Sequence, residues 1–361
     1  MDAQTSPAAL SQLIESHDMG TVFKIENGIA AVADPWSSDA PHAPRVRRVR
    51  RPAPSRLLFF AVFLGLPLLV YIVFVVSPFL QAFYYSLTDW KGVSGNADFI
   101  GLDNYVRIFT DPVYLKALRN NLLLMIILPT VTITLAFVLA VMVTIGGDTK
   151  GEIHGIRGSN IYRVVSFFPY VLPAVVIGIL FAFIYSPNGG LLNGLLNLPL
   201  RLLNALGADV RLVGTAWLGD PRFALGAIIL AVVWSLVGFY MVLFVAAIKA
   251  IPSEIIEAAR LDGCGRVRLA AQVVLPQIRE NVSTAVVYMG IMALDMFVYV
   301  SVMTPSGGTA RSTEVVSRYL YETAFARSQF GLASAMGVVL ALVTMLMAVI
   351  VLFGSRSKED A

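Results

Sequence analysis

Six long apolar segments divide this chain, and they constrain its fold more than any other feature of the sequence. They cover residues 57–80, 121–145, 164–185, 223–248, 282–303 and 332–353. About 20 apolar residues in a helix that rises about 1.5 Å per residue cross a hydrocarbon core of about 30 Å. Hydrophobic residues make up 57% of the chain and charged residues only 14%. The sequence therefore predicts an all-α integral membrane protein, a helical bundle of six spans.

The polar segments outside the spans set the predicted domain limits. Residues 1–56 lack sustained periodicity and end in an arginine-rich stretch, which predicts a largely disordered basic tail. Residues 57–354 form the predicted membrane domain, and residues 355–361 form a short C-terminal tail. The first apolar segment is long and lacks a small-residue cleavage site, so we expect an uncleaved span and not a signal peptide.

Charge near the span ends predicts the orientation, because cytoplasmic segments are enriched in lysine and arginine. Outside the N-terminal tail, lysine and arginine are equally numerous on the two sides of the membrane. The arginine cluster before the first span therefore determines the predicted orientation. It consists of Arg45, Arg47, Arg48, Arg50, Arg51 and Arg56. We expect a multi-pass plasma-membrane protein with both termini in the cytoplasm. A nucleic-acid or lipid-headgroup patch would have a similar composition, but beside a first span topology determination is favoured, so membrane lipid and no nucleic acid is expected among the partners.

The loop between the fourth and fifth spans is polar, helix-prone and tightly spaced. Pro252 ends the fourth span, Ser253 can cap a new helix, and Glu254 suits the positive N-terminal end of that helix. Asp262 and Gly263 would end it, because glycine readily adopts the backbone conformation of a sharp reversal.

A second predicted helix covers residues 266–274 and is stopped by Leu275-Pro276, which completes a rigid helix-turn-helix between two spans. A compact element of this kind can transmit the motion of a partner into the membrane helices. The chain has no GxxxxGK[ST] phosphate loop, so a pump built on it would need a separate ATPase.

One segment of this loop carries a family signature. Glu257-Ala258-Ala259 is followed after three residues by Gly263, and after nine more by Val273, one residue and Leu275-Pro276. The pattern resembles the "EAA" loop of permease subunits of binding-protein-dependent ABC importers. Val273 stands where the usual residue is isoleucine.

Further segments, in the same order, resemble carbohydrate importers of the maltose and glycerol-phosphate type, from about residue 57 to residue 353. They are Ser86-Leu87-Thr88-Asp89-Trp90, residues 99–105, residues 188–193, Asp295, Tyr299, Thr304, Gly307-Gly308, Thr313, Tyr319 and residues 321–325. Thr309 stands where such families place a proline after the double glycine, so that outer turn is expected to differ.

The resemblance implies a six-span bundle of the ABC importer permease type with a cytoplasmic coupling helix. The residues that it assigns to ATPase coupling are Glu254, Glu257, Ala258, Ala259, Asp262, Gly263 and Pro276. It implies a second permease subunit, two ATPase subunits and an extracytoplasmic substrate-binding lipoprotein as partners, with a sugar or short oligosaccharide as substrate. ATP and Mg would bind to the ATPase subunits, and no cofactor to this chain. Glycerol phosphate is the alternative substrate, although the spans lack the basic residues that an anion would favour.

Polar and aromatic residues of the spans are the candidates for a substrate path. Asp295 lies inside the fifth span, where inserting a carboxylate costs about 2.5 to 3.5 kcal/mol. It could bind sugar hydroxyls, relay a proton or form a hydrogen bond between helices. Tyr299 lies one helical turn on, and Trp234 and Tyr240 in the fourth span could stack on sugar rings. Asn121 opens the second span and could pair with hydroxyls or cap the helix.

No set of residues typical of catalysis or metal binding is recognisable. His17, His42 and His154 are scattered, Cys264 is the only cysteine, and no paired carboxylates mark a pocket. A secondary carrier would require a series of charges in the membrane, where Asp295 stands nearly alone. A membrane-embedded glycan or lipid enzyme would need acidic or histidine clusters. The sequence therefore predicts a transport subunit and no enzyme.

The segment between the third and fourth spans, residues 186–222, is too broken to cross the bilayer. Within residues 191–206, leucines are interrupted by Asn193, Asn197, Arg201 and Asn204. This pattern predicts an amphipathic interfacial helix with a break at Pro199.

Overall fold

The computed structural model describes residues 58–59, 61–92, 97–145 and 158–356. The chain divides into a unit of residues 1–63 and a larger unit of residues 64–361. The predicted basic tail with its arginine cluster, and the C-terminal tail from residue 357, lie outside the described residues. Every regular element of the described part is helical, apart from a single β-bridge between Thr88 and Phe99.

Helices lie over each of the six apolar segments. Four are continuous and apolar enough to cross a bilayer: Val62–Tyr85, α6 (Pro112–Ile145), α10 (Ala224–Lys249) and the apolar part of α17 (Phe330–Arg356). The first of these joins η1 (Ala61–Gly65), α3 (Leu66–Tyr71), η2 (Ile72–Val76) and α4 (Ser77–Tyr85). The other two segments are bent, so the described part contains four spans, or six if each bent pair counts as one.

The bent pairs are α7 (Ser159–Val171) with α8 (Ala174–Ile184), and α14 (Arg279–Leu294) with α15 (Phe297–Met303). The first pair meets at 99° around Leu172-Pro173. Leu172 has ψ 135°, because the residue before a proline avoids the helical conformation. The second pair meets at 47° around Asp295-Met296, where no proline is present.

Shorter helices connect these spans. They are α5 (Asp103–Thr110), α9 (Leu191–Ala205), α11 (Ser253–Leu261), α12 (Arg266–Arg268), η3 (Leu269–Val274), α13 (Leu275–Gln277), η4 (Pro305–Gly307), η5 (Thr309–Arg311), α16 (Val316–Tyr321) and η6 (Glu322–Ala326). α9 continues through Pro199, so the predicted break there is wrong. A proline removes only one backbone N–H, and hydrogen bonds made by Asn197 and Asn204, on either side of it, hold the helix.

α6 begins at Pro112, before the apolar segment that starts at residue 121, and Asp111-Pro112 is the helix entry that the sequence offers there. Asp111 Oδ1 accepts a hydrogen bond from the backbone N–H of Val113 at 2.8 Å, and the fixed φ of a proline suits the first turn. The capping residues therefore set the start of this helix, and its apolar content does not.

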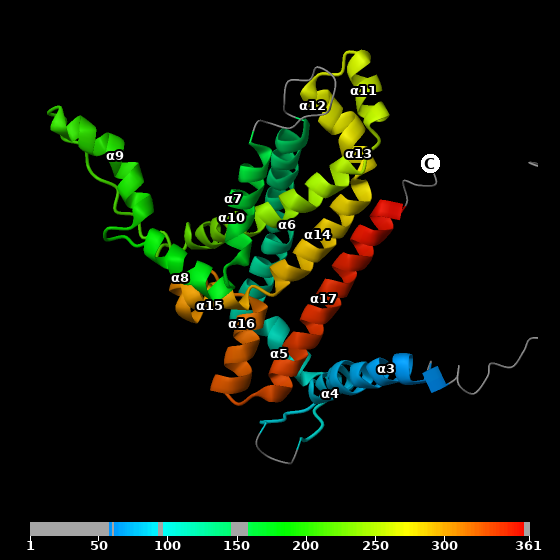
Figure 1. The fold of residues 1–361 in the computed structure, drawn as a ribbon. Helices are drawn as coiled ribbons and strands as arrows, with labels where there is room; N and C mark the ends of the chain where they lie inside the picture. The colour runs from blue at the N-terminus through cyan, green and yellow to red at the C-terminus, as the bar shows by residue number, and fades with distance from the viewer. Residues whose placement is uncertain (1–57, 60, 93–96, 146–157, 357–361) are drawn as a thin grey trace, which may run out of the picture. The chain divides into compact units, whose positions relative to one another are not determined.

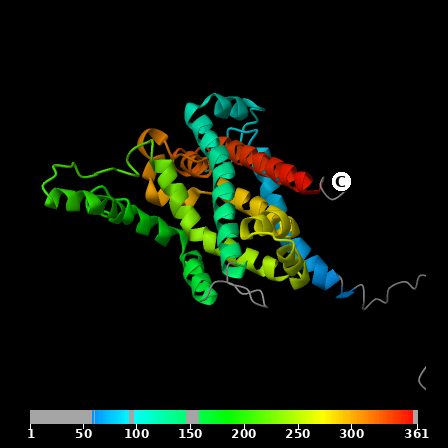
Figure 2. The same ribbon diagram turned by 90° about the horizontal axis from the view of Figure 1, so that it is seen from above.

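The core of the larger unit lies where α6 packs against α10 and α14, as Figures 1 and 2 both show. α10 also packs closely on α7. A Cβ atom at Gly238 of α10 would overlap the backbone carbonyl oxygen of Ser166 in α7. The missing side chain at Gly238 is therefore what permits this approach.

Candidate functional site

The C-terminal end of α11 is closed by a tight turn. Gly263 has φ +80°, in the left-handed region that favours glycine. Its N–H donates to the carbonyl oxygen of Arg260 at 3.0 Å. The next N–H, that of Cys264, donates to the carbonyl oxygen of Ala259 at 3.0 Å. This pair of bonds is the Schellman arrangement, which satisfies the last carbonyls of a helix and fixes where it stops.

Two predicted boundaries of this loop are wrong. Ser253 does not cap α11, because Pro252 takes the capping position and Ser253 is already helical. Pro276 does not stop the second helix, which passes from π-helical η3 into α13 and ends at Gln277. Pro276 therefore lies inside a continuous helical segment, directly after the π-helical turn η3.

α11 packs on η3 and contributes one buried side chain to the core. Ile256 is 2% exposed and belongs to the same buried cluster as Ile145 at the end of α6 and Ile248 near the end of α10. Arg260 Nη2 also donates to the carbonyl oxygen of Ile145, at 3.5 Å. Arg260 therefore links α11 to the end of α6, and the apolar cluster that contains Ile256 extends to the end of α10.

The opposite side of α11 is uncovered among the described residues. Its exposed residues, with the one that follows the helix, are Glu254, Ile255, Glu257, Ala258, Leu261 and Asp262. Leu261 is 89% exposed, which is costly for a leucine in water. Among the other residues predicted for coupling, Ala259 is half-buried on α11 and Pro276 is exposed on α13.

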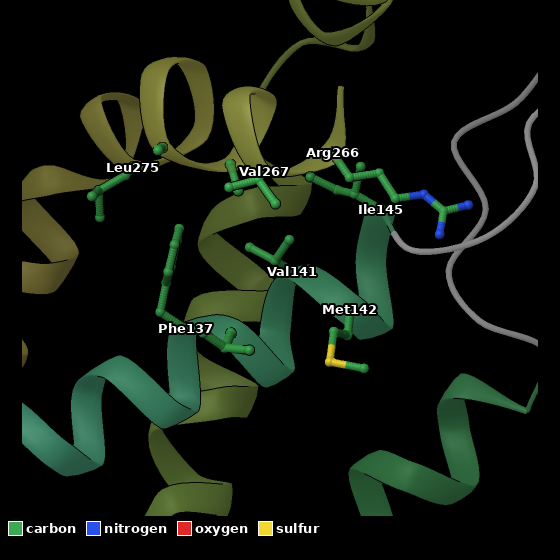
Figure 3. A pocket seen from close by; sticks show the side chains of 10 residues that line it. Phe137, Val141, Met142, Ile145, Arg266, Val267 and Leu275 are labelled. Carbon is green, nitrogen blue, oxygen red and sulfur yellow. The ribbon is translucent and has the colours of Figure 1, made fainter. Parts of the chain in front are cut away.

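A cavity of about 380 Å³ lies between the end of α6 and the α12–η3 segment (Figure 3). Its lining is apolar except for one residue: Phe137, Val138, Val141, Met142, Ile145, Arg266, Val267, Ala270, Ala271 and Leu275. The guanidinium of Arg266 points away from the apolar side chains in Figure 3. Sugars need hydrogen-bonding partners, so this cavity is no candidate for the substrate path.

Asp295 lies at the break between α14 and α15 and is exposed. Its φ and ψ of −103° and 63° are not helical. The break leaves the carbonyl oxygen of Leu294 without its helical partner, and Asn121 Nδ2 donates to that oxygen at 3.0 Å. The Oδ1 of Asn121 accepts the backbone N–H of Val316 at 2.7 Å. Asn121 thus lies within α6 and joins the end of α14 to the start of α16, and it does not cap α6 itself.

The four other candidates for the substrate path have different surroundings. Trp234 is 39% exposed and makes an edge contact with Phe181. The hydroxyl of Tyr299 is 3.3 Å from that of Ser235. Tyr240 is 1% exposed, and its side chain, like that of fully buried Asn121, has no open approach. Among the five candidates, Asp295 and Trp234 are exposed and Tyr299 is half-buried, whereas Tyr240 and Asn121 are buried in this conformation.

A cluster of charged residues between α15 and α17 was not predicted. Arg318 Nε donates to Glu314 Oε1 at 2.6 Å, and Arg311 Nη1 donates to Glu314 Oε2 at 2.7 Å. Glu322 accepts from Arg311 at 2.6 Å and from Arg327 at 2.6 Å. The Glu314 side chain is fully buried. The i, i+4 spacing of Glu314, Arg318 and Glu322 was the signal available in the sequence.

This cluster holds a strained turn. Ser306, Ala310 and Arg311 have φ of 59°, 52° and 58°, in the left-handed region that side chains rarely adopt. Such a backbone persists only where its surroundings fix it. The ion pairs of Arg311, and the two bonds that Asn120 Nδ2 donates to the carbonyl oxygens of Ser312 and Glu314 at 3.0 and 2.9 Å, supply that constraint.

The sequence of the chain is similar to transport proteins over most of its length. Residues 151–356 match the family model "Binding-protein-dependent transport system inner membrane component". The diacetylchitobiose uptake system permease protein NgcF of Streptomyces coelicolor is 49% identical over 84% of this chain and 83% of its own. The probable ABC transporter permease protein YurN of Bacillus subtilis is 35% identical over 81% of this chain and 95% of its own.

A solved structure shares the fold. A chain of a bacterial alginate ABC transporter, crystallised in complex with a pentasaccharide-bound periplasmic protein, superposes with a TM-score of 0.68. The two are 20% identical, and the match covers 83% of this chain and 94% of the other. The six-span arrangement with bent spans is thus that of an ABC importer permease. This chain belongs to the family of inner membrane components of binding-protein-dependent transport systems.

Proposed function

We propose that this chain is the membrane-spanning permease subunit of an ATP-driven importer of short oligosaccharides, and that α11 is its coupling helix. The observation that carries this proposal is the anchorage of α11. Ile256 is buried in the apolar cluster that also includes the ends of α6 and α10, and Arg260 donates a hydrogen bond to the last residue of α6, whereas Glu257 and Leu261 remain exposed. A partner that binds the exposed side and moves would displace the membrane helices with it.

The proposed partners are a second permease subunit, two ATPase subunits and an extracytoplasmic substrate-binding lipoprotein. ATP and Mg bind to the ATPase subunits, and hydrolysis takes place there, since the sequence has no phosphate loop. Both termini and α11 lie in the cytoplasm, and the start of α10 lies on the outer side. Family membership supports this assembly, because an inner membrane component of a binding-protein-dependent system works with a binding protein.

The substrate path runs past the break at Asp295. The carboxylate there is exposed and can accept hydrogen bonds from hydroxyl groups. Beyond it lies a chain of ring contacts, from Phe297 to Tyr321 at 5.2 Å and from Tyr321 to Phe325 at 4.8 Å between centroids. Tyr321 and Phe325 are 52% and 64% exposed. Exposed ring faces beside a carboxylate suit the apolar faces and the hydroxyls of a sugar.

The name of the relative at 49% identity supports an oligosaccharide as substrate, and diacetylchitobiose is the first compound to test. The experiment uses cells in which this gene is deleted and which take up no diacetylchitobiose by another route. The intact chain is expressed in these cells, and the uptake of radiolabelled diacetylchitobiose is measured. We expect the intact chain to restore uptake. Failure of the intact chain, present in the membrane at normal amounts, would exclude this disaccharide.

The coupling role is tested with charge changes on the exposed side of α11. Leu261→Asp and Glu257→Arg should abolish uptake while the chain remains in the membrane, because the partner's binding surface is altered and Ile256 is not. Glu280→Arg, on the exposed start of α14, serves as the control and should retain uptake. Full uptake by both α11 variants would show that the exposed side of α11 does not bind the ATPase subunit.

A further inference from the structure

One side of α9 is occupied by the chain itself. Asn197 Nδ2 donates to the carbonyl oxygen of Val213 at 2.9 Å, and its Oδ1 accepts the Val213 N–H at 2.7 Å. Asn204 forms the same pair of bonds with Val210, at 2.9 and 2.7 Å. The two asparagines therefore pair with the backbone of the extended segment that follows the helix, and the polar side of α9 is satisfied.

A third asparagine fixes the base of the helix. Asn193 is 3% exposed; its Nδ2 donates to the carbonyl oxygen of Thr215 at 3.0 Å, and its Oδ1 accepts the indole N–H of Trp217 at 2.8 Å. Trp217 contacts Phe223, at 5.6 Å between ring centroids, directly before α10 begins. α9 and the returning segment thus form one body attached to the start of a membrane span.

The opposite side of α9 is a continuous leucine face. It consists of Leu191, Leu195, Leu198, Leu202 and Leu206, which are 60%, 54%, 58%, 65% and 78% exposed. At 3.6 residues per turn these positions fall within an arc of about 80°, on the side away from the asparagines. α9 extends away from α6, α10 and α14 in Figures 1 and 2, and no described residue covers this face.

We propose that the leucine face of α9 is embedded in the lipid of the membrane leaflet opposite α11, so that α9 lies along the bilayer surface. Trp217 and Phe223 mark the level of the interface, where aromatic residues gather at the ends of spans. Arg201 on α9 and Arg211 on the returning segment are exposed, and arginines beside an apolar face reach phosphate headgroups. A helix with its polar side satisfied internally and leucines outward buries that face in acyl chains.

This position gives α9 a role in the importer. It would hold the start of α10 at a fixed depth while the other end of α10 moves with α11. The assignment to the outer leaflet rests on the proposed function and orientation, whereas the embedding itself does not.

The test measures depth directly in the full chain. Cysteines replace Leu195, Leu198 or Leu202 in a Cys264→Ser background, and a nitroxide label is attached to each. Ala208→Cys and Asp209→Cys, exposed on the returning segment, are the matched controls. In nanodiscs of phosphatidylethanolamine and phosphatidylglycerol, power saturation compares collisions with oxygen, which enters lipid, and with a nickel chelate, which stays in water.

We expect the three leucine positions to collide several-fold more with oxygen, and less with nickel, than the two controls. Nickel access at the leucine positions equal to that of the controls would place the face in water and overturn the proposal. Low access for both reagents would place it against protein, either a second copy or a partner, and would also overturn it. The depth measurement needs neither ATP nor sugar. A result against lipid embedding therefore does not contradict the transport proposal, and a failure of sugar uptake does not contradict lipid embedding.

Discussion

At the scale of a single residue, Gly263 determines where the chain turns after α11. Its φ of +80° costs an alanine about 1 to 2 kcal/mol, because a Cβ crowds the backbone in the left-handed region. Nothing lies within 4 Å of the position that a Cβ would take, so crowding by neighbours adds nothing. We expect Gly263→Ala to lower the thermal unfolding midpoint of the purified chain modestly and sugar uptake strongly.

Gly265 provides the matched control for this change. It too has no atom within 4 Å of a built Cβ, but its φ is −66°, which any residue adopts. Gly265→Ala should therefore leave both the unfolding midpoint and the uptake unchanged. Equal effects of the two variants would mean that space, and not backbone conformation, limits this loop.

Glu322 makes the stability of the charged cluster between α15 and α17 depend on pH. The hydrogen bond from Arg311 is the largest cause that holds the pKa of Glu322 well below its ordinary value of 4.5; partial burial opposes it, and Arg327 and Arg318 lower the pKa further. Since the pKa is lower in the folded state, the stabilisation is present above about pH 4.5 and is lost as the pH falls through the folded value.

The expected outcome is a thermal unfolding midpoint of the chain that stays level from pH 7 to about pH 4.5 and falls steeply as the pH is lowered further. Glu322→Gln should lower the midpoint at pH 7 and flatten this dependence. Glu280→Gln, an exposed glutamate on α14, should retain the steep dependence. An unfolding midpoint of the unmodified chain that does not change with pH would show that the charged cluster does not contribute to its stability.

The packing of α10 on α7 depends, at the scale of elements, on a missing side chain. A Cβ at Gly238 would overlap the Ser166 carbonyl oxygen, whereas at Gly226, on the same helix, it would meet nothing within 4 Å. Overpacking of this kind costs about 1 to 3 kcal/mol, and a glycine replaced by alanine in an open helical position gains about 0.5 to 1 kcal/mol. Gly238→Ala should lower the unfolding midpoint of the chain, and Gly226→Ala should raise it slightly or leave it unchanged.

The orientation of the whole molecule can be tested with two exposed positions that lie at opposite ends of α10. In a Cys264→Ser background, Leu261→Cys marks α11, and Arg222→Cys marks the turn before α10. A membrane-impermeant maleimide added to intact cells should label position 222 and leave position 261 unlabelled until the cells are opened. Labelling of position 261 in intact cells would show that the orientation is the reverse of the proposed one. α11 could then not bind a cytoplasmic ATPase.

Local patterns were enough to predict most of the membrane helices and the turn at Gly263 that ends α11. An apolar run of about 20 residues needs no particular neighbour to be stable in lipid, and Asp262-Gly263 ends a helix through its own backbone preferences. Helix limits that depend on single contacts were predicted less well. Pro199 and Pro276 both lie within helices that they were expected to break or stop.

The sequence by itself determined that the chain crosses the membrane and belongs with importer permeases, because hydropathy and the spacing of Glu257, Gly263 and Pro276 are properties of the linear chain. Only the tertiary structure decided that Asn121 braces the break at Asp295 and that Glu314 is buried among arginines. Those roles arise from hydrogen bonds between residues far apart in sequence, and a buried polar group is stable only where folding brings it a partner.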